Sequence, residues 1–401
     1  MADDTPILLF GAFDRHNFGD LLFPHIAAAL LPGRRLIHAG LAARDLRPCG
    51  GHQTRAIAQL AVELRDQPLH ILHVGGELLA CDAWQAAVML QTPEQAQEII
   101  ARNERDPALR RTWAAQTLGL GDEAPYCIAR ELFPAAKQVS YCAVGGVELA
   151  QRDAVMQNEV MEKLCRADSV SVRDQATQSH LAAVATDVAL TPDPAVMVAE
   201  LFGDEIKQHA RHGEPAQVRA AFPQGYLAVQ LSADFGDDAT LAAIAAQLDA
   251  IARASGFAIV LFRAGAAPWH DDLACYRRLA ACMHAPAIWL FTSLHLWDIC
   301  ALIAHSRGYC GSSLHGRIVA MAHGLPRLNV QPAAVATHPS KQQAYCRCWE
   351  LPGLPVQVAV GEIAAAWSAA SAVPQAMLRQ LAAELAQEYR GCFTALVAAL
   401  T

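Results

Sequence analysis

Apolar runs of strand length alternate with segments of helical periodicity along most of this chain. A buried parallel strand is continuously apolar, whereas a helix has apolar positions three and four residues apart, as at Leu241, Ile244, Leu248 and Ile251. The runs that we predict to be strands are residues 5–10, 69–74, 138–144, 169–172, 187–190, 226–231, 257–262 and 287–291. Strands separated by helices in this way predict an α/β fold with parallel sheets.

A second series of alternating strands and helices begins at Tyr226, after a polar stretch at residues 207–215. A chain of 401 residues is too long for one ordinary core and suits two domains. We therefore expect an N-terminal domain at residues 1–205 and a C-terminal domain at residues 222–360. Two further segments are helical by pattern: an insertion at 83–119 in the first domain, and a C-terminal helix at 374–401 that packs back on that domain. The apolar stripe of this last helix is Leu378, Leu381, Leu385, Tyr389, Cys392, Leu396 and Leu400.

The composition narrows the class of protein. With 53% hydrophobic and 17% charged residues, the chain can bury a large core and shows no sign of disorder. A net charge of −8 argues against nucleic-acid binding, so an anionic ligand must be held by a local site. The composition therefore favours a globular protein that binds small molecules.

The cysteines and the N-terminus indicate a cytoplasmic protein. Many of the twelve cysteines lie inside apolar runs, as buried side chains rather than a disulfide framework, and Cys346 and Cys348 lack the spacing of a zinc site. The start of the chain is acidic, unlike a secretory signal, and no apolar run approaches the roughly 18 residues that span a membrane. We expect no metal, no cofactor and no transmembrane segment, and leave peripheral membrane association open.

Residues 308–326 carry the clearest candidate chemistry. They predict a strand end, a turn and a short helix, which Ser312 or Ser313 caps and Gly324 with Pro326 ends. The positive end of a helix binds phosphate or carboxylate and disfavours imidazolium, so His315 in the first turn is suited to act as a base. The alternative is a capped helix whose histidine merely bonds a neighbour.

Polar and glycine residues follow two strands of the first half. Asn17 and Asp20 come after the strand at 5–10, and Gly75 and Gly76 follow the strand at 69–74. Open α/β sheets bind ligands at the carboxyl ends of their strands, so these residues are candidates for substrate binding. Asp20 could instead only cap a helix. A dinucleotide fingerprint of the G-x-G-x-x-G type is absent.

Taken in order, several short motifs resemble the polysaccharide pyruvyl transferase family over about residues 5–350. They are Asn17-Phe-Gly-Asp20 with Pro24, Gly75-Gly76, Val172-Arg173-Asp174, Asp193-Pro194-Ala195, Ser312-Ser-Leu-His-Gly316, Gly324-x-Pro326 and Lys341. The resemblance implies an α/β fold of two Rossmann-like domains with a central cleft, similar to the glycosyltransferase-B architecture, with the acceptor side first and the donor side second. It also implies transfer of a pyruvyl group from phosphoenolpyruvate to a sugar.

The motif at residues 312–316 differs from the sequence found in many members of that family. Those members have Arg-Leu-His where this chain has Ser313-Leu-His315, so an arginine that would hold phosphate or carboxylate is missing. Other relatives have Ser-Ser-Leu-His-Gly, which indicates a subgroup. Arg317 and Arg173 are the nearest cations that could substitute.

The chemistry of ketal formation matches these residue types. Phosphoenolpyruvate must be protonated at C3 and attacked at C2 by a sugar hydroxyl. It must then lose phosphate as a second hydroxyl closes the ring. The reaction needs an acid/base and an anion site, roles that we assign to His315 and Arg173. Arg173 could instead form an ordinary salt bridge with Asp174 or Asp193. The residues expected to bind substrate are Asn17, Asp20, Gly75, Gly76, Ser312, Ser313, Arg317 and Lys341.

Phosphoenolpyruvate is thus the expected donor, and a sugar or lipid-linked oligosaccharide the expected acceptor. One alternative is a nucleotide-sugar glycosyltransferase of the same architecture. Many such enzymes have a donor-binding glutamate in Glu-Ala-Met-Ala-x-Gly-x-Pro, where this chain has Val319. The other alternative is a non-catalytic glycan-binding relative.

Overall fold

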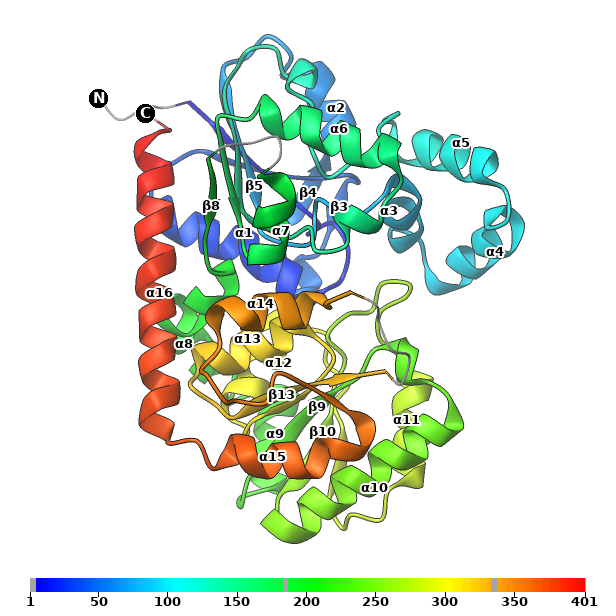
Figure 1. Cartoon of the computed structure of the whole chain (residues 1–401), viewed down its shortest axis with the longest axis vertical. Helices are drawn as coiled ribbons and strands as arrows, with labels where there is room; N and C mark the ends of the chain where they lie inside the picture. The colour runs from blue at the N-terminus through cyan, green and yellow to red at the C-terminus, as the bar shows by residue number, and fades with distance from the viewer. Residues whose placement is uncertain (1–4, 183–186, 333–337, 401) are drawn as a thin grey trace. The chain divides into compact units, whose positions relative to one another are not determined.

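The structure, a computed structural model, describes residues 5–182, 187–332 and 338–400. The chain forms two compact units (Figure 1). The first unit comprises Met1–Pro194 and Glu388–Thr401, and the second comprises Ala195–Gln387. Each unit has its own sheet, so residues 5–200 and 225–345 do not share one.

The first unit is built on an eight-stranded sheet with the order β3-β4-β2-β1-β5-β6-β7-β8. All neighbouring strands pair in parallel except β3 and β4. The strands are β1 (Ile7–Phe10), β2 (Leu36–Gly40), β3 (Arg44–Asp45), β4 (Gln53–Ala56), β5 (Leu69–Val74), β6 (Ala136–Val144), β7 (Ser169–Val172) and β8 (Val188–Leu190). The carboxyl ends of β1, β5, β6, β7 and β8 consequently meet at one edge.

The helices of this unit pack on the sheet or extend from it (Figure 1). They are α1 (Phe18–Leu30), α2 (Ile57–Glu63), α3 (Ala83–Met89), α4 (Pro93–Asn103), α5 (Pro107–Leu118), α6 (Ala154–Cys165) and α7 (Gln175–Leu181). Residues such as Phe10, Ile71 and Tyr141 on the strands pack with α2, α3, α5 and α6 in one apolar cluster. The segment predicted to be helical at 83–119 consists of α3, α4 and α5.

The second unit has a six-stranded, entirely parallel sheet with the order β11-β10-β9-β12-β13-β14. Its strands are β9 (Tyr226–Gln230), β10 (Ala258–Leu261), β11 (Ile288–Leu290), β12 (Tyr309–Gly311), β13 (Arg327–Gln331) and β14 (Gln357–Ala359). Its helices are α8 (Val198–His209), α9 (Gly213–Ala221), α10 (Asp238–Ser255), α11 (Leu273–Cys282), α12 (Leu296–Ala304), α13 (Leu314–Ala322), α14 (Lys341–Trp349) and α15 (Ile363–Ser371).

Alternate strand residues of this sheet face one apolar layer. Leu227, Ile259 and Leu328 pack with Leu248 of α10 and Trp367 of α15 in a single buried cluster. The central strands are buried on both faces, as expected of a parallel sheet, and read as continuous apolar runs. The periodicity of α10 and the strand predictions at 226–231 and 257–262 are therefore confirmed.

The last helix, α16 (Gln375–Ala398), contributes to both units. In the first unit its Tyr389 is fully buried, stacks on Phe393 and brings its hydroxyl within 3.7 Å of the Cys142 sulfur. The predicted apolar stripe therefore serves packing. The twelve cysteines all carry free thiols. Among the described residues, no helix combines the length and apolar character that crossing a membrane requires.

Candidate functional site

The stretch at 308–326 folds as predicted. β12 ends at Gly311, and the side chain of Ser313 caps α13 by accepting a hydrogen bond of 3.1 Å from the Gly316 N–H. His315 is the second residue of α13, and 7% of its surface is exposed. Gly324 ends the helix in the left-handed conformation, at φ 62°. The structure thus places His315 at the mouth of a capped helix, at the carboxyl edge of the second sheet.

A glutamine occupies part of that helix mouth. The side-chain oxygen of Gln230, at the end of β9, accepts from the Ser312 N–H at 3.2 Å and the Ser313 N–H at 2.7 Å. Ser312 also accepts from the Ser232 N–H through its hydroxyl, at 2.8 Å. The N–H groups of Ser312 and Ser313, directly before α13, are therefore already bonded within the protein. In the structure, these hydrogen bonds fix the loop before His315.

Gln230 links the helix mouth to a buried acid. Its amide nitrogen donates to the Asp271 carboxyl at 2.8 Å, and the Ala264 N–H donates to the other Asp271 oxygen at 2.6 Å. Burial raises the pKa of Asp271 to about 7, against the opposing effect of these hydrogen bonds. Asp271 can therefore change protonation state near neutral pH. Sequence analysis missed both residues, although the polar Gln230 at the end of an apolar strand was a usable signal.

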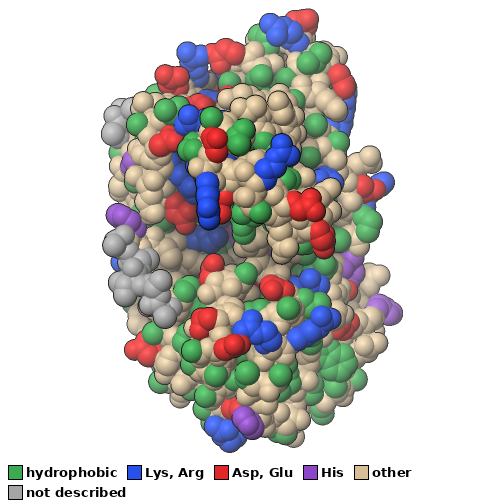
Figure 2. Space-filling view, turned by 90° about the vertical axis from the view of Figure 1, so that its right-hand side faces the viewer, with side chains coloured by type: hydrophobic (Ala, Val, Ile, Leu, Met, Phe, Trp, Pro, Cys, Tyr) green, Lys and Arg blue, Asp and Glu red, His purple; other side chains and the backbone are tan. Residues whose placement is uncertain are grey.

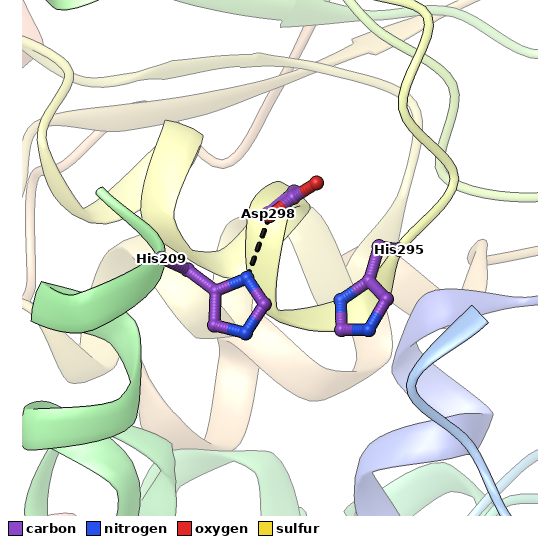
Figure 3. Close-up of side chains that lie close together, drawn as sticks. All are labelled: His209, His295 and Asp298. Carbon is purple, nitrogen blue, oxygen red and sulfur yellow. Dashed lines mark hydrogen bonds and ion pairs between the residues drawn. The ribbon is translucent and has the colours of Figure 1, made fainter. Parts of the chain in front are cut away.

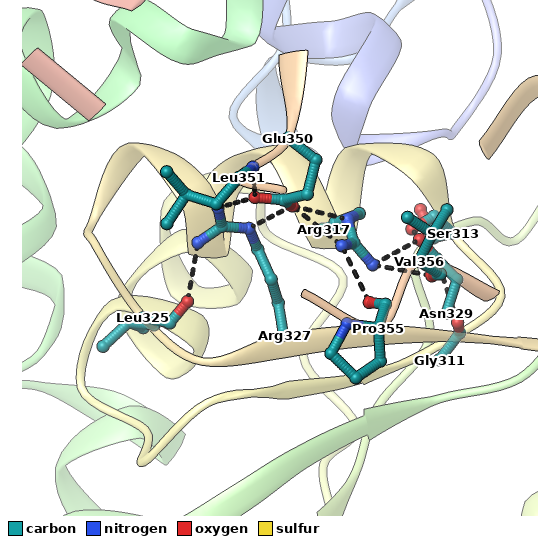
Figure 4. Close-up of polar contacts among 10 residues, drawn as sticks. All are labelled: Gly311, Ser313, Arg317, Leu325, Arg327, Asn329, Glu350, Leu351, Pro355 and Val356. Atoms are coloured by element: carbon teal, nitrogen blue, oxygen red, sulfur yellow. Dashed lines mark hydrogen bonds and ion pairs between the residues drawn. The ribbon is translucent and has the colours of Figure 1, made fainter. Parts of the chain in front are cut away.

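Arg317 belongs to a buried ion network in the second unit (Figure 4). It donates to Glu350 at 2.7 Å and to the carbonyl of Val356 at 2.8 Å, and it is fully buried. Arg327 donates to the same carboxylate, at 2.9 Å from its Nε. Because its donors are used in this interior network, Arg317 is explained as a structural residue. The prediction that it replaces the arginine missing before Leu314 is not supported.

Lys341 is the first residue of α14 and is exposed. The helix is capped by Ser340, whose hydroxyl accepts from the Gln343 N–H at 3.2 Å. Its second residue, Gln342, donates to the Ser312 carbonyl, which ties α14 to the loop before His315. Residues 333–337, which precede this helix, lie outside the described part of the chain.

In the first unit, the predicted residues shape the carboxyl edge of the sheet. Asn17 caps α1, with its side-chain oxygen accepting from the Gly19 N–H at 3.2 Å. Gly75 and Gly76 turn the chain after β5 with φ of 60° and 83°, a conformation that favours glycine. A Cβ at Gly76 would lie 3.6 Å from a carboxylate oxygen of Asp20, so these two residues are neighbours. Asn17, rather than Asp20, is therefore the cap.

A cation that sequence analysis missed lies beside Asp20. The side chain of Arg15 is only 10% exposed, donates to the Tyr126 hydroxyl, and comes no closer than 4.0 Å to the Asp20 carboxylate. Its Nε is buried and has no hydrogen-bond partner within the described ranges. Burial raises the pKa of the neighbouring Asp14, against the opposing effect of Arg15. Arg15 therefore has the properties of an anion-binding residue; its signal was a charged pair directly after an apolar strand.

Arg173 is buried at the end of β7 and is held by two carboxylates. It donates to Asp193 at 2.8 Å and to Glu77 at 2.6 Å. Asp174 instead caps α7, accepting from the Thr177 N–H at 2.8 Å. The salt bridge between Arg173 and Asp193 that sequence analysis kept as an alternative is therefore present, whereas Asp174 has a capping role.

The predicted residues thus form two groups. Asn17, Asp20, Gly75, Gly76 and Arg173 lie at the carboxyl edge of the first sheet, and Ser312, Ser313, His315, Arg317 and Lys341 lie in the second unit. In the first group, Arg173 contacts Glu77, the residue that follows the two glycines. Acidic and basic side chains are interspersed over the face shown in Figure 2. This distribution agrees with a local site rather than a broad charged surface.

The fold has known counterparts among solved structures. The chain is similar to the UDP-GlcNAc 2-epimerase from Neisseria meningitidis, solved with UDP-GlcNAc bound, at 11% identity and a TM-score of 0.54 over 98% of this chain and 99% of that one. It is also similar to the alpha,alpha-trehalose 6-phosphate synthase from Burkholderia multivorans, at 12% identity and a TM-score of 0.50 over 99% and 97%. These neighbours confirm the predicted glycosyltransferase-B fold class.

Sequence comparisons address the family. No functionally curated protein matches the chain. The family model of polysaccharide pyruvyl transferase matches residues 153–330, which include Arg173, the capped loop at 312–313 and His315. Residues 153–330 therefore match the family model of polysaccharide pyruvyl transferase, which confirms the predicted resemblance for the motifs between Val172 and Pro326.

Proposed function

We propose that this protein transfers a pyruvyl group from phosphoenolpyruvate to a sugar, acting in the cytoplasm, and that His315 is its acid/base. The observation that carries the proposal is the position of His315. The residue lies in the first turn of α13, directly after a fixed loop, inside the range that matches the family. The acceptor is proposed to be a sugar of a glycan precursor, free or lipid-linked.

The reaction balances with one acid/base. As the first sugar hydroxyl adds to C2 of phosphoenolpyruvate, His315 takes the hydroxyl proton and delivers it to C3, which turns the methylene into a methyl group. The second hydroxyl then attacks C2, its proton leaves with the phosphate, and the C2–O bond to phosphate breaks. The products are a pyruvate ketal and inorganic phosphate. A positioned acid/base of this kind contributes about 10²- to 10⁴-fold in rate.

In the first unit, considered by itself, we propose that Arg15 can bind an anionic group. Its weak ionic partner at 4.0 Å leaves charge for a carboxylate or phosphate, which arginine binds through two parallel hydrogen bonds. Arg173, by contrast, has its charge compensated by Glu77 and Asp193. We therefore propose that Arg173 shapes the edge of the sheet on which substrate binds, rather than taking the anion alone.

The test is the substitution His315→Gln, which keeps size and some hydrogen bonding but removes proton transfer. Phosphate release from phosphoenolpyruvate that depends on an acceptor should fall at least about 100-fold at saturating donor. The melting temperature should change little. A buried histidine with only a structural role would instead lower stability by about 1 to 3 kcal/mol and leave turnover of the folded protein near normal.

His323→Gln is the matched control, because His323 follows the same helix at its opposite end. It should retain normal turnover. Equal losses in both variants would contradict the assignment of His315, since they would reflect damage to α13 and not lost proton transfer.

A further inference from the structure

Two histidines and an aspartate outside the proposed site lie close together in the second unit (Figure 3). They are His209, His295 and Asp298, and one nitrogen or oxygen atom from each lies within 4.8 Å of the other two. The imidazole rings of His209 and His295 stack at 4.8 Å between centroids. None of the three has a role in the proposed pyruvyl transfer.

Local structure explains how they meet. His209 is the last residue of α8, while His295 is the N-cap of α12 and Asp298 lies in the first turn of that helix. Because α8 packs against α12, the end of one helix faces the start of the other. Residues three apart at a helix start point to the same side, so His295 and Asp298 both face His209.

Hydrogen bonds already hold two of the side chains. Asp298 places one carboxylate oxygen 2.6 Å from His209 Nδ1 and accepts from the Ser293 hydroxyl at 2.6 Å with the other. The second ring nitrogen of His209 lies 3.3 Å from the Glu205 carboxylate. Metal-binding side chains are typically oriented by further hydrogen bonds, which a carboxylate or hydroxyl makes to each histidine or aspartate.

His295 supplies the observation that hydrogen bonding leaves unexplained. Its Nδ1 is buried and has no hydrogen-bond partner in the part of the chain that the structure describes. A buried nitrogen without a partner is costly, and binding a metal ion would satisfy it.

We propose that His209, His295 and Asp298 form a binding site for a divalent transition-metal ion of the Zn²⁺ type. Two imidazoles and one carboxylate are ligands that Zn²⁺ accepts, with bonds of about 2.0 to 2.2 Å. Ligand atoms around a tetrahedral ion are therefore roughly 3.3 Å apart. The contact of 2.6 Å between His209 and Asp298 has to widen slightly, and the longer separations have to close.

Charge also favours a cation at this position. Asp298 and Glu205 bring two carboxylates to His209, and an ion of charge +2 would balance them. The ion would join the end of α8 to the start of α12 and so stabilise the second unit. Sequence analysis predicted no metal because His209 is far along the chain from His295 and Asp298, and the latter pair alone is no metal motif.

The experiment measures Zn²⁺ bound to the full chain, purified without a histidine tag and treated with a chelator. Zinc is titrated in competition with a chromophoric chelator, and the stoichiometry is checked by elemental analysis. We expect one site per chain. His295→Gln should weaken zinc binding by at least about tenfold. Even residues that only hydrogen-bond to the metal ligands contribute about 10- to 100-fold to metal affinity. Ser293→Ala should weaken it less.

His284→Gln is the control, because His284 is exposed and lies 3.3 Å from Asp249 without a second histidine. It should leave zinc affinity unchanged. Zinc binding that is absent from the native chain, unaffected by His295→Gln, or reduced equally by His284→Gln would overturn the proposal. Circular dichroism verifies folding, and Asp298→Asn gives a second test if His295→Gln does not fold.

Discussion

Asp271 is a buried acid connected to the helix mouth through Gln230. It receives hydrogen bonds from Gln230 and Ala264, which favour the carboxylate, yet burial outweighs them and sets its pKa at about 7. In the unfolded chain the same carboxyl has a pKa near 3.8. Between these pH values the folded protein binds more protons than the unfolded chain, so its stability falls as pH rises.

This difference predicts the pH dependence of stability. Asp271 should lower the free energy of unfolding progressively from about pH 4 to about pH 7, by roughly 4 kcal/mol in total at 1.36 kcal/mol per pKa unit. Asp271→Asn cannot ionise, so its stability relative to the native chain should rise over this range. Denaturant unfolding at several pH values measures the difference. A difference that is constant with pH would show that Asp271 is ionised at neutral pH in the folded protein.

Between neighbouring elements, the close approach of α13 to β12 depends on Gly316. A Cβ at this position would lie 2.5 Å from ring atoms of Tyr309, a buried side chain that also bonds Gln230 and Ser313. Gly316→Ala should therefore destabilise the protein by about 1 to 3 kcal/mol, although alanine itself favours helix by about 1 kcal/mol. Thermal unfolding measures the change.

Gly391→Ala is the matched control in α16, because a Cβ there has no atom within 4 Å. It should be neutral or slightly stabilising. If Gly316→Ala behaved in the same way, Tyr309 would have room to move, and the helix mouth would be less tightly fixed than the contacts indicate.

The ion network of α13, β13 and the end of α14 supports a second prediction at this scale. Glu350 lies between Arg317 and Arg327, and all three side chains are buried. Burial alone would raise the pKa of Glu350, but the two guanidinium groups hold it below its usual range. Glu350→Gln leaves two buried positive charges without a counter-ion, which typically costs about 3 to 5 kcal/mol.

Chemical denaturation measures this cost, and Asp204→Asn provides the comparison. Asp204 pairs with Lys207 on the surface, where an ion pair adds little, so its loss should leave stability unchanged. If Glu350→Gln were as stable as Asp204→Asn, water would have to hydrate the two guanidinium groups in place of the lost carboxylate.

The elements that sequence analysis identified are those with continuous apolar runs, such as β5 and β9, and the capped helix α13. It missed β13, because Arg327 and Asn329 interrupt the apolar pattern. Their hydrogen-bond partners include the distant Glu350 and Gly311. The strand β2 is half-exposed at its start and lacks a long apolar run. Local pattern thus predicts buried strands and caps, whereas a polar residue in a core depends on contacts that only the fold creates.

The same limit applies to the candidate site. His315 was identifiable because the serines before it and the glycine after it define a helix start within a few residues. Arg15 and Asp271 were not, because they are buried in contact with Tyr126 and Gln230, which lie far away in sequence. Arg317 lies two residues after His315, but its side chain donates to Glu350 and to the Val356 carbonyl in the interior, which sequence spacing alone does not reveal.

At the scale of the whole molecule, the fold does not choose between donors, because the glycosyltransferase-B architecture alone specifies no substrate. Val319 does bear on the choice: it is fully buried in α13 and cannot accept the hydrogen bonds of a nucleotide ribose. We therefore expect phosphoenolpyruvate, and not UDP- or GDP-sugars, to raise the melting temperature. A ligand at about 100 times its dissociation constant adds roughly 2.7 kcal/mol, which calorimetry detects readily.

The His315→Gln variant refines this last prediction. Since the substitution removes proton transfer but keeps the capped loop, phosphoenolpyruvate should still stabilise the variant, while acceptor-dependent phosphate release is lost. Stabilisation of the native chain by a UDP-sugar but not by phosphoenolpyruvate would favour the glycosyltransferase alternative. Stabilisation by phosphoenolpyruvate without turnover, over a broad set of sugar acceptors, would favour a binding protein that has kept the fold and the donor site but not the reaction.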